Sequence, residues 1–470
     1  MKTMEVTQWL EQALPRAQTG RVDLAALTRG IAISSLSLTI LTASFRYRWL
    51  LFSEETSRVW SDYTNGLFFV HDAFLIIALF LWVLSIWLQP RRIKFGPLAL
   101  SLPLAGLGLA ALTSTGFSLD IRLSTYHLVR LLMAAGLYLF LINEIRDLKI
   151  LIWGVAGGLF IQASVSVAQV LAQHDLGLQW LGEYRLDPAW PGVSIVWAEG
   201  IRSLRAYGLS DHPNVLGGVL AFSIILLASW SLGRTSKSGV IGTGLFILGN
   251  VALLLTFSRS AWVALVVSFL LMAGILIGSR QKDALKRGLE LILATAIVAA
   301  PFIWATSAYL GVRLNSDDSF DSISYESRSL SERARLNVYA NQIFAANAVT
   351  GVGYGTFPLA LSQVEPELPF NYQPPHLVML EAAAETGLFG ASFYMLAILG
   401  PWLVMWLKRS RLTVTPALVG ASALLLAVTV VSFFDYYPWL LAVGRFWQWL
   451  AWGLWAAFFQ RSLDGNKSND

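Results

Sequence analysis

Apolar runs close to the length of a membrane-spanning helix recur along most of this chain, separated by polar connections. A helix rises about 1.5 Å per residue, so roughly 20 apolar residues cross the hydrocarbon core of a bilayer. The pattern therefore predicts an all-α integral membrane protein with about twelve transmembrane helices. The expected helices are 29–44, 67–89, 95–113, 125–142, 150–173, 213–232, 239–257, 260–278, 289–311, 376–407, 413–432 and 441–460.

Composition agrees with a membrane-embedded chain. Of the 470 residues, 56% are hydrophobic and 13% are charged, whereas an average soluble domain has roughly 25% charged residues. The absence of Cys excludes disulfides, thiol nucleophiles and Cys-ligated metal centres. In so apolar a chain, the net charge of +5 indicates membrane orientation rather than nucleic-acid binding.

Positive charge falls on alternate connections between the expected helices. The basic connections contain Arg91-Arg92-Ile93-Lys94, Arg146 with Lys149, Arg234 with Lys237, Arg280 to Arg287, and Lys408-Arg409-Ser410-Arg411. The positive-inside rule assigns these connections, and so both termini, to the cytoplasm. Every Lys falls on that side, whereas the outer side has only Arg. A guanidinium is a planar fork suited to phosphate oxygens, so this asymmetry favours phosphate recognition outside the membrane.

These assignments predict five parts. They are a cytoplasmic N-terminal segment without the features of a cleaved signal peptide (1–28), transmembrane helices one to nine with an outer loop at 174–206 (29–311), a large extracytoplasmic loop (312–375), transmembrane helices ten to twelve (376–460) and a cytoplasmic tail (461–470). Connections longer than about 15 residues are uncommon and are usually functional or disordered. In the large loop, Ser331 as N-cap and the spacing of Leu336, Tyr339 and Ile343 predict a helix over 331–346.

Two polar clusters lie where outer connections meet expected helices. In the first, Arg205 is a candidate phosphate ligand with Asn214 near a helix start, and the alternative is ordinary interfacial residues. The second is the turn Ser258-Arg259-Ser260. A lone Arg there either snorkels to lipid headgroups or faces a polar cavity, and the following helix start would favour an anion. Tyr207, Trp190, Trp197 and Tyr372 are aromatic residues that could stack on a ring-shaped ligand, although such residues more often form interfacial belts.

Two further clusters lie in and after the large loop. Arg333 and Arg335 are two residues apart and diverge on a helix, so only one can face a given ligand, and solvated charge is the alternative. His376 follows two prolines and precedes Glu385-Thr386-Gly387. A neutral imidazole can take a proton from a hydroxyl near physiological pH, which makes His376 a candidate base. No set of His, Asp and Glu has a recognised ligand spacing, so no metal site is expected.

In this order, the clusters resemble the O-antigen ligase and O-antigen polymerase superfamily of bacterial membrane glycosyltransferases. The matching elements are Arg-x-x-Gly-x-x-x-x-Pro-Asn at 205–214, Ser-Arg-Ser at 258–260, Glu332-Arg333 entering an outer-loop helix, Gly351-Val352-Gly353-Tyr354-Gly355-Thr356-Phe357, His376, and Glu385-Thr386-Gly387-Leu388-Phe389-Gly390. The resemblance covers roughly residues 200–410. It does not separate a ligase from a polymerase.

The resemblance implies a GT-C-like multi-helix fold in the bacterial inner membrane, with an active site facing the periplasm. It implies transfer of a glycan from an undecaprenyl-diphosphate donor to a hydroxyl of a glycolipid or glycan acceptor, without cofactor, metal or nucleic acid. By this resemblance, Arg205 and Arg259 would bind the diphosphate, assisted by Arg333 or Arg335. His376 would take the proton of the acceptor hydroxyl. Asn214, Tyr207 and Glu385 would support them. The family often has Asn directly after this His, where this chain has Leu377.

A multi-helix transporter, or a flippase of the lipid-linked glycan, is the alternative from another class. It predicts repeat symmetry and functional polar residues near the bilayer midplane. We find no convincing internal repeat. The obvious intramembrane candidates, Asp72, Arg130 and Asp435, are each expected near a helix end.

Overall fold

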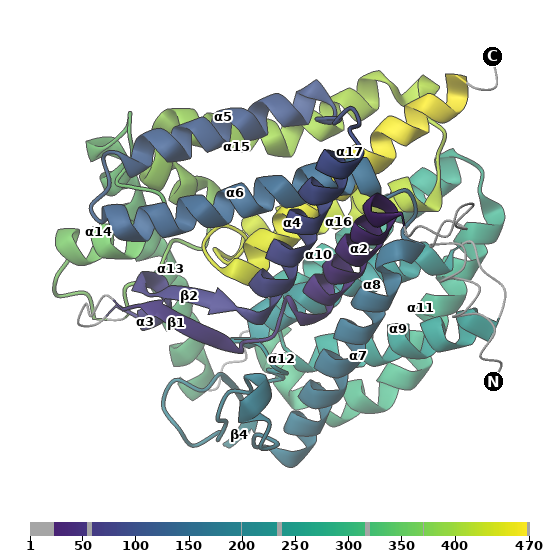
Figure 1. Cartoon of the computed structure of the whole chain (residues 1–470). Coiled ribbons are helices and arrows are strands. Elements are labelled where there is room, and N and C mark those ends of the chain that lie inside the picture. The colour runs from purple at the N-terminus through teal and green to yellow at the C-terminus, as the bar shows by residue number, and fades with distance from the viewer. Residues whose placement is uncertain are drawn as a thin grey trace.

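The computed structural model describes residues 23–53, 59–198, 200–232, 237–314, 320–369 and 371–467. This part of the chain is mostly helical, and a long helix coincides with each of the twelve predicted segments (Figure 1). The long helices are α2 (Leu24–Thr42), α4 (Val70–Leu88), α5 (Leu98–Thr115), α6 (Ile121–Glu144), α7 (Lys149–Ala172), α8 (Pro213–Ser231), α9 (Lys237–Leu255), α10 (Arg259–Gly278), α11 (Lys282–Ala305), α15 (Val378–Leu407), α16 (Pro416–Ser432) and α17 (Ala442–Lys467).

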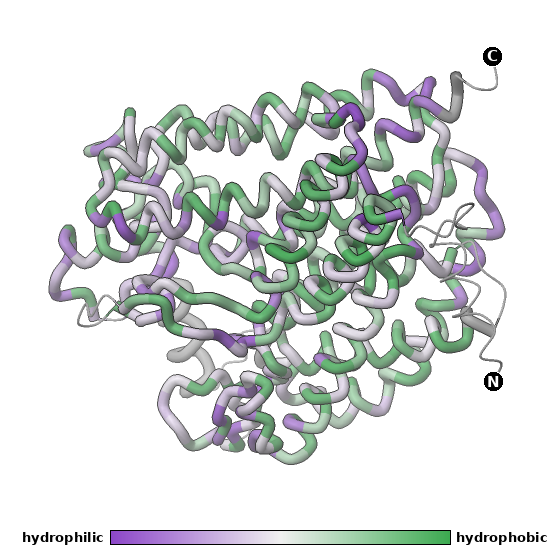
Figure 2. The backbone as a smooth tube through the Cα atoms, viewed as in Figure 1, coloured by the Kyte–Doolittle hydropathy of each residue, from purple (hydrophilic) through white to green (hydrophobic). Residues whose placement is uncertain are grey.

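Length and hydropathy identify this helical bundle as membrane-embedded. Within the described ranges, nine helices are long and apolar enough to cross a membrane, while the apolar parts Val240–Leu255 and Pro416–Ser432 are shorter. Large apolar side chains such as Phe80, Trp153 and Ile297 stay exposed, and apolar residues follow the long helices throughout Figure 2. Such surfaces are stable against lipid, where only helices or closed barrels satisfy the backbone. The predicted all-α integral membrane fold is confirmed.

Helix α8 lies at the centre of the bundle. In the most apolar 18-residue stretch of α8, 89% of the residues are buried, compared with 33% in the same stretches of α2, α4, α10 and α15. It contacts α7, α9, α10 and α16, while α15 packs along α5 and α17 packs against α6. Because α8 starts just after the Arg205 cluster, the centre of the bundle fixes that cluster in place.

Several helix starts differ from the hydropathy pattern, and for α4 and α6 polar and backbone contacts account for the difference. Helix α4 begins at Val70, since β2 (Gly66–Phe69) first pairs antiparallel with β1 (Arg48–Phe52). Helix α6 begins at Ile121, where the Asp120 carboxylate accepts the Leu123 N–H at 2.9 Å as an N-cap. Hydropathy measures neither interaction.

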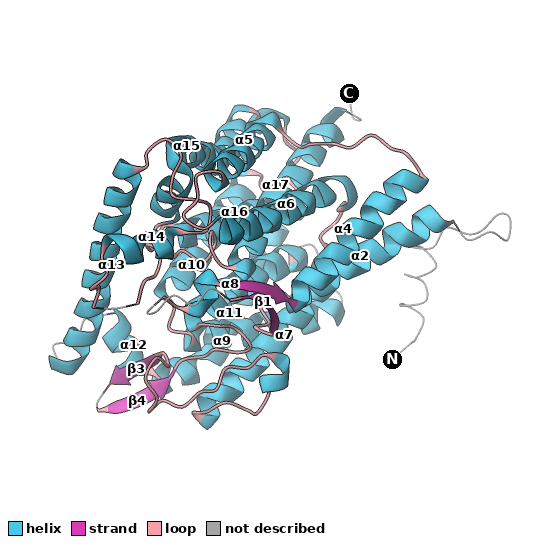
Figure 3. Cartoon of the chain, turned by 60° about the vertical axis from the view of Figure 1, so that its left-hand side comes forward, coloured by secondary structure: helices cyan, strands magenta, loops and turns pink. Residues whose placement is uncertain are grey.

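Most elements outside these twelve helices gather at one end of the bundle, called the loop end below, while both termini of the described chain lie at the opposite end (Figures 1 and 3). The loop end contains α3 (Ser61–Thr64), η1 (Gln179–Leu181), β3 (Ile195–Ala198) paired with β4 (Ile201–Leu204), α12 (Ser307–Leu314), α13 (Phe320–Ala346) and α14 (Phe357–Val364). The expected helix at 331–346 is present, but α13 begins earlier, at Phe320. Ser331 therefore lies inside the helix, and its predicted role as an N-cap is wrong.

Two glycines let the chain after α13 pack backbone to backbone on α15. Gly351 has φ +71°, and a Cβ there would lie 2.1 Å from the Glu385 carbonyl oxygen. Gly387 has φ +69° inside α15, and a Cβ there would lie 2.3 Å from the Val349 oxygen. Only glycine combines this backbone conformation with so close an approach. The contact fixes the first turns of α15, directly after His376.

Candidate functional site

Arg205 is buried at the loop end, where its guanidinium joins two separate motifs. Its Nε donates to the Thr256 carbonyl oxygen at 2.8 Å, and the neighbouring Ala206 N–H donates to the Leu255 oxygen at 3.0 Å. These bonds attach the segment directly after β4, at the end of the first long loop, to the turn between α9 and α10. Arg259 opens α10 from that same turn and is half-buried. The Arg205 and Ser258-Arg259-Ser260 motifs are therefore neighbours in space.

A run of polar contacts leads from Arg205 to His376. Arg205 Nη2 donates to Asn214 Oδ1 at 2.7 Å, and Asn214 Nδ2 donates to Asp435 Oδ2 at 3.1 Å. The other oxygen of Asp435 lies 3.6 Å from His376 Nδ1. Four side chains, from the residue after β4, from α8 and from the connections before α15 and α17, thus form one group, called the polar run below.

His376 lies just before α15, with its side chain 15% exposed. Burial lowers the pKa of its imidazole to about 4, the Asp435 carboxylate opposes this shift, and the Arg333 charge adds to it. The ring stands edge-on to Tyr436, with the two ring centroids 5.1 Å apart. At neutral pH the imidazole is therefore uncharged and able to accept a proton, with a carboxylate beside it to stabilise the resulting cation.

Arg333 and Arg335 diverge, as their spacing on α13 predicts. Arg333 is half-buried; its charge adds to the lowering of the His376 pKa and opposes the raising of the Tyr436 pKa that burial causes. Arg335 is exposed and acts instead on Tyr339, one turn further along α13. Of the two guanidiniums, Arg333 is the one in electrostatic contact with the polar run.

Tyr207 braces the first loop from within. It is 2% exposed, its hydroxyl accepts the Ser194 N–H at 2.6 Å, and its ring stacks on Tyr184. Tyr372 is equally buried, so neither ring can receive a sugar. Trp190 and Trp197 remain exposed, at 47% and 39%.

Glu385 holds the glycine-rich segment that precedes α14. Its carboxylate accepts the Gly355 N–H at 2.8 Å, the Phe357 N–H at 3.1 Å and the Trp439 indole N–H at 2.7 Å. All its contacts are therefore structural ones. They tie α14 and the connection after α16 to α15, and so keep the His376 and Asp435 segments together.

Asp435 is the member of this group that sequence reasoning did not assign to the site. From the sequence, Asp435 is a candidate only for the transporter alternative, as a charged residue within the membrane. The one available signal was its position, since it is the only charged residue in the connection 433–441. Its neighbours Asn214 and His376 are distant in sequence, so only the fold brings the three together.

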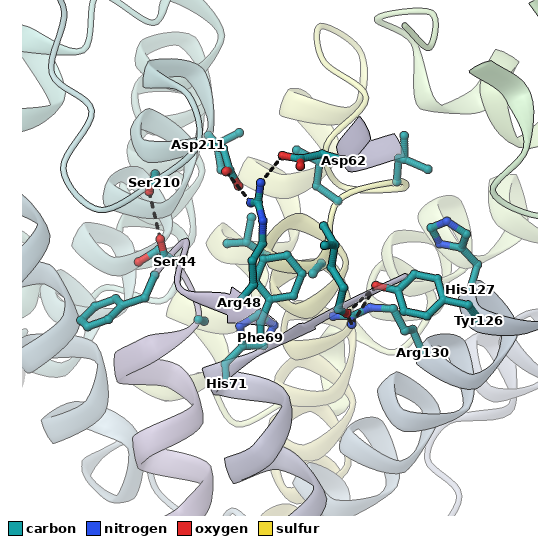
Figure 4. A pocket seen from close by; sticks show the side chains of 18 residues that line it. Ser44, Arg48, Asp62, Phe69, His71, Tyr126, His127, Arg130, Ser210 and Asp211 are labelled. Atoms are coloured by element: carbon teal, nitrogen blue, oxygen red, sulfur yellow. Dashed lines mark hydrogen bonds and ion pairs between the residues drawn. The ribbon is translucent and has the colours of Figure 1, made fainter. Parts of the chain in front are cut away.

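A second polar cluster lies beside the polar run, where Arg48 sits between Asp211 and Asp62 (Figure 4). The Arg48 to Asp211 bond is 2.7 Å long, and it fastens the strands β1 and β2 to the first long loop. His71 and His127 line the same pocket, whose volume is about 40 Å³. A buried water needs about 10–15 Å³ measured in this way, so the pocket has room for a few waters but not for a sugar. We assign this cluster to packing of the loop end.

Among the described residues, no group of three or more His, Asp or Glu side chains is arranged to hold a metal ion. The polar run, together with Arg259 and Arg333, supplies guanidiniums, one neutral imidazole and one carboxylate. Such a set suits an anionic substrate and the transfer of one proton.

Comparison with known proteins agrees with this geometry. Residues 243–395 match the sequence model of a family described as O-antigen ligase. No curated protein matches the chain. The matched stretch contains Arg259, Arg333, Arg335, His376 and Glu385, and it ends before Asp435. Residues 243–395 are thus similar to O-antigen ligases, and this match supports the resemblance of the chain to the O-antigen ligase and polymerase superfamily.

Proposed function

We propose that this protein is a glycosyltransferase that moves a glycan from an undecaprenyl-diphosphate donor to an acceptor hydroxyl. The observation that carries the proposal is the polar run, which joins a buried guanidinium to a neutral imidazole through Asn214 and Asp435. The O-antigen ligase match supports the class of reaction, and the superfamily resemblance supplies the lipid diphosphate.

The guanidiniums bind the leaving group in this proposal. When the bond between the anomeric carbon and the diphosphate oxygen breaks, negative charge grows on that oxygen. Arg205 and Arg259, assisted by Arg333, stabilise this charge. Preorganised donors do so most effectively where water is partly excluded, and Arg205 is buried. The bond from Arg205 to Thr256 holds its guanidinium in place before the substrate arrives.

His376 acts on the acceptor. As the acceptor oxygen forms its bond to the anomeric carbon, its proton passes to the neutral imidazole of His376. The Asp435 carboxylate, 3.6 Å from Nδ1, stabilises the imidazolium that results. Asn214 bonds both Arg205 and Asp435 and keeps the donor and acceptor halves of the site in register. Tyr207 and Glu385 support the segments that carry these groups.

The proposal includes location and partners. The positive-inside pattern supports an inner-membrane protein with the loop end facing the periplasm. The donor glycan, a glycolipid or glycan acceptor, and membrane lipids would meet there.

The test uses the purified full chain in lipid nanodiscs with a lipid-diphosphate glycan and two acceptors. One acceptor is a core glycolipid and the other a second lipid-linked glycan, and the products are identified by mass. We expect a product in which the glycan has left the diphosphate, and the acceptor that gains it distinguishes a ligase from a polymerase. Intact donor with both acceptors, combined with movement of the donor across proteoliposomes, would favour the flippase alternative.

A further inference from the structure

A wide groove opens on the first long loop, and none of the residues that line it belongs to the polar run. Its volume is about 500 Å³, compared with about 40 Å³ for the pocket of Arg48. Ligand sites in proteins typically measure about 300–1,000 Å³. The groove is therefore the larger of the two spaces by an order of magnitude, and a short oligosaccharide fits it.

Aromatic rings and guanidiniums line this groove. Trp190 is 47% exposed although it is among the most apolar residues, and Tyr184 lies beside it on the lining. The Arg46 guanidinium stands 4.7 Å from the Tyr184 ring centroid and also bonds Asp211 at 2.7 Å. Arg185 lines the groove, is exposed, and makes no ion pair with a carboxylate in the part of the chain that the structure describes.

These side chains match the chemistry of an acidic sugar. The apolar face of a pyranose packs on an exposed aromatic ring, which buries area at little entropic cost. A carboxylate or phosphate on that sugar pairs with a guanidinium, whose planar fork accommodates two oxygens at once. A lipid tail would instead require an apolar lining without two arginines.

Hydrogen bonds and close packing brace the loop that forms the groove. Buried Glu183 accepts the Leu176 N–H at 2.8 Å, the Leu178 N–H at 2.6 Å and the Gln169 side-chain N–H at 2.7 Å. Gly182 has φ +94°, and a Cβ there would lie 2.3 Å from the Tyr47 nitrogen, so the loop packs tightly on the segment before β1. Preorganisation of this kind lowers the entropic cost of binding.

The groove shares a wall with the polar run. The Arg205 N–H donates to the Ser194 oxygen at 3.3 Å, and the Ser194 N–H donates to the Tyr207 hydroxyl at 2.6 Å. Val193 lines the groove directly before Ser194. A sugar chain attached to a diphosphate at Arg205 therefore has the groove beside it.

We propose that this groove is a saccharide subsite that binds an anionic sugar, bearing a uronate or a phosphate, through Trp190 and Arg185. The subsite deepens the proposed function and rests on it for the identity of the natural ligand. That sugar belongs either to the donor glycan or to the acceptor.

The binding test uses trigalacturonate as the probe, with the purified full chain in nanodiscs and isothermal titration calorimetry. Trp190→Ala and Arg185→Gln should each weaken binding about tenfold, since a charge-assisted bond or an aromatic contact is worth ~1.4 kcal/mol. The fully methyl-esterified trisaccharide should bind the wild-type chain no more tightly than trigalacturonate binds the Arg185→Gln variant. Trp180→Ala and Arg202→Gln are matched controls, because both residues are exposed on the same loop outside the groove lining.

Two outcomes would overturn the subsite. Either the wild-type chain fails to bind trigalacturonate, or the two control variants weaken binding as much as the groove variants do. Melting temperatures equal to that of the wild type establish that each variant is folded. Because both substituted residues are exposed, we expect no change in melting.

Transfer kinetics separate the two sources of the sugar and the two proposals. With an acidic glycan donor, a raised KM for the donor in Trp190→Ala assigns the groove to the donor, and a raised KM for the acceptor assigns it to the acceptor. If the wild-type chain binds trigalacturonate but transfers no glycan, the subsite is supported and the proposed function is contradicted. Transfer with both KM values unchanged in Trp190→Ala, and no trigalacturonate binding, would do the reverse.

Discussion

His376 owes its state to groups far from it in the sequence. Burial alone would leave a neutral ring with little tendency to hold a proton, and the nearby Asp435 and Arg333 charges act on it in opposite directions. If the neutral ring is the base, kcat is constant well above the His376 pKa of about 4, and it is half-maximal where the pH equals that pKa.

Replacement of Arg333 should move that acid limb. Its charge lowers the pKa of His376, so Arg333→Gln removes a repulsion and shifts the midpoint of the limb to higher pH, whatever its effect on the maximal rate. The measurement is kcat against pH from single-turnover transfer. Arg335→Gln is the matched control, because this residue is exposed and acts on Tyr339 instead. Coincident limbs for wild type and Arg333→Gln would contradict the assigned contact.

Single residues also show where sequence reasoning ends. Arg205, Asn214 and His376 could be selected because their residue types suit phosphate and proton chemistry at the ends of apolar runs. Asp435 could not be assigned, since its role depends on contacts with α8 and on the segment before α15. Glu385 can be grouped with the site from its motif, but its bonds to backbone N–H groups are tertiary contacts that no spacing rule supplies.

At the scale of elements, the long helices follow from hydropathy because about 20 apolar residues leave few alternatives in a bilayer. Their starts do not, as β2 before α4 and the Asp120 cap of α6 illustrate. The backbone contact between the chain after α13 and α15, made at Gly351 and Gly387 and called the joint below, appears in the sequence only as glycine motifs. Its function as a close backbone contact required the fold.

This joint should be intolerant of a single methyl group. Gly387 has φ +69° and ψ −173°, a region essentially restricted to glycine, and strain there costs about 1–3 kcal/mol before the clash with Val349 is added. Gly387→Ala should therefore lower the melting temperature in nanodiscs and reduce transfer. Gly108→Ala in α5, where nothing lies within 4 Å, should melt at or slightly above the wild-type temperature. Equal melting of the two variants would show that the joint is not the rigid contact described here.

At the scale of the whole molecule, the loop end collects every proposed functional group, and the charge pattern assigns it to the periplasm. The lack of native Cys makes this orientation directly measurable. Ala189→Cys at the loop end should react with a membrane-impermeant maleimide added to intact spheroplasts, and Gln89→Cys at the opposite end only after permeabilisation. Both native residues are exposed. Labelling in the reverse order would place the loop end in the cytoplasm and remove the proposed reaction.

The central claim is that the polar run from Arg205 to His376 acts as one unit. A double-mutant cycle with Asn214→Ala and His376→Ala tests it most directly, with single-turnover transfer as the readout and donor binding measured in parallel. Groups that act together in one transition state give strongly non-additive losses. We expect the double variant to be about as slow as the slower single variant. Losses that simply multiply would show that the two residues act independently and would contradict the account.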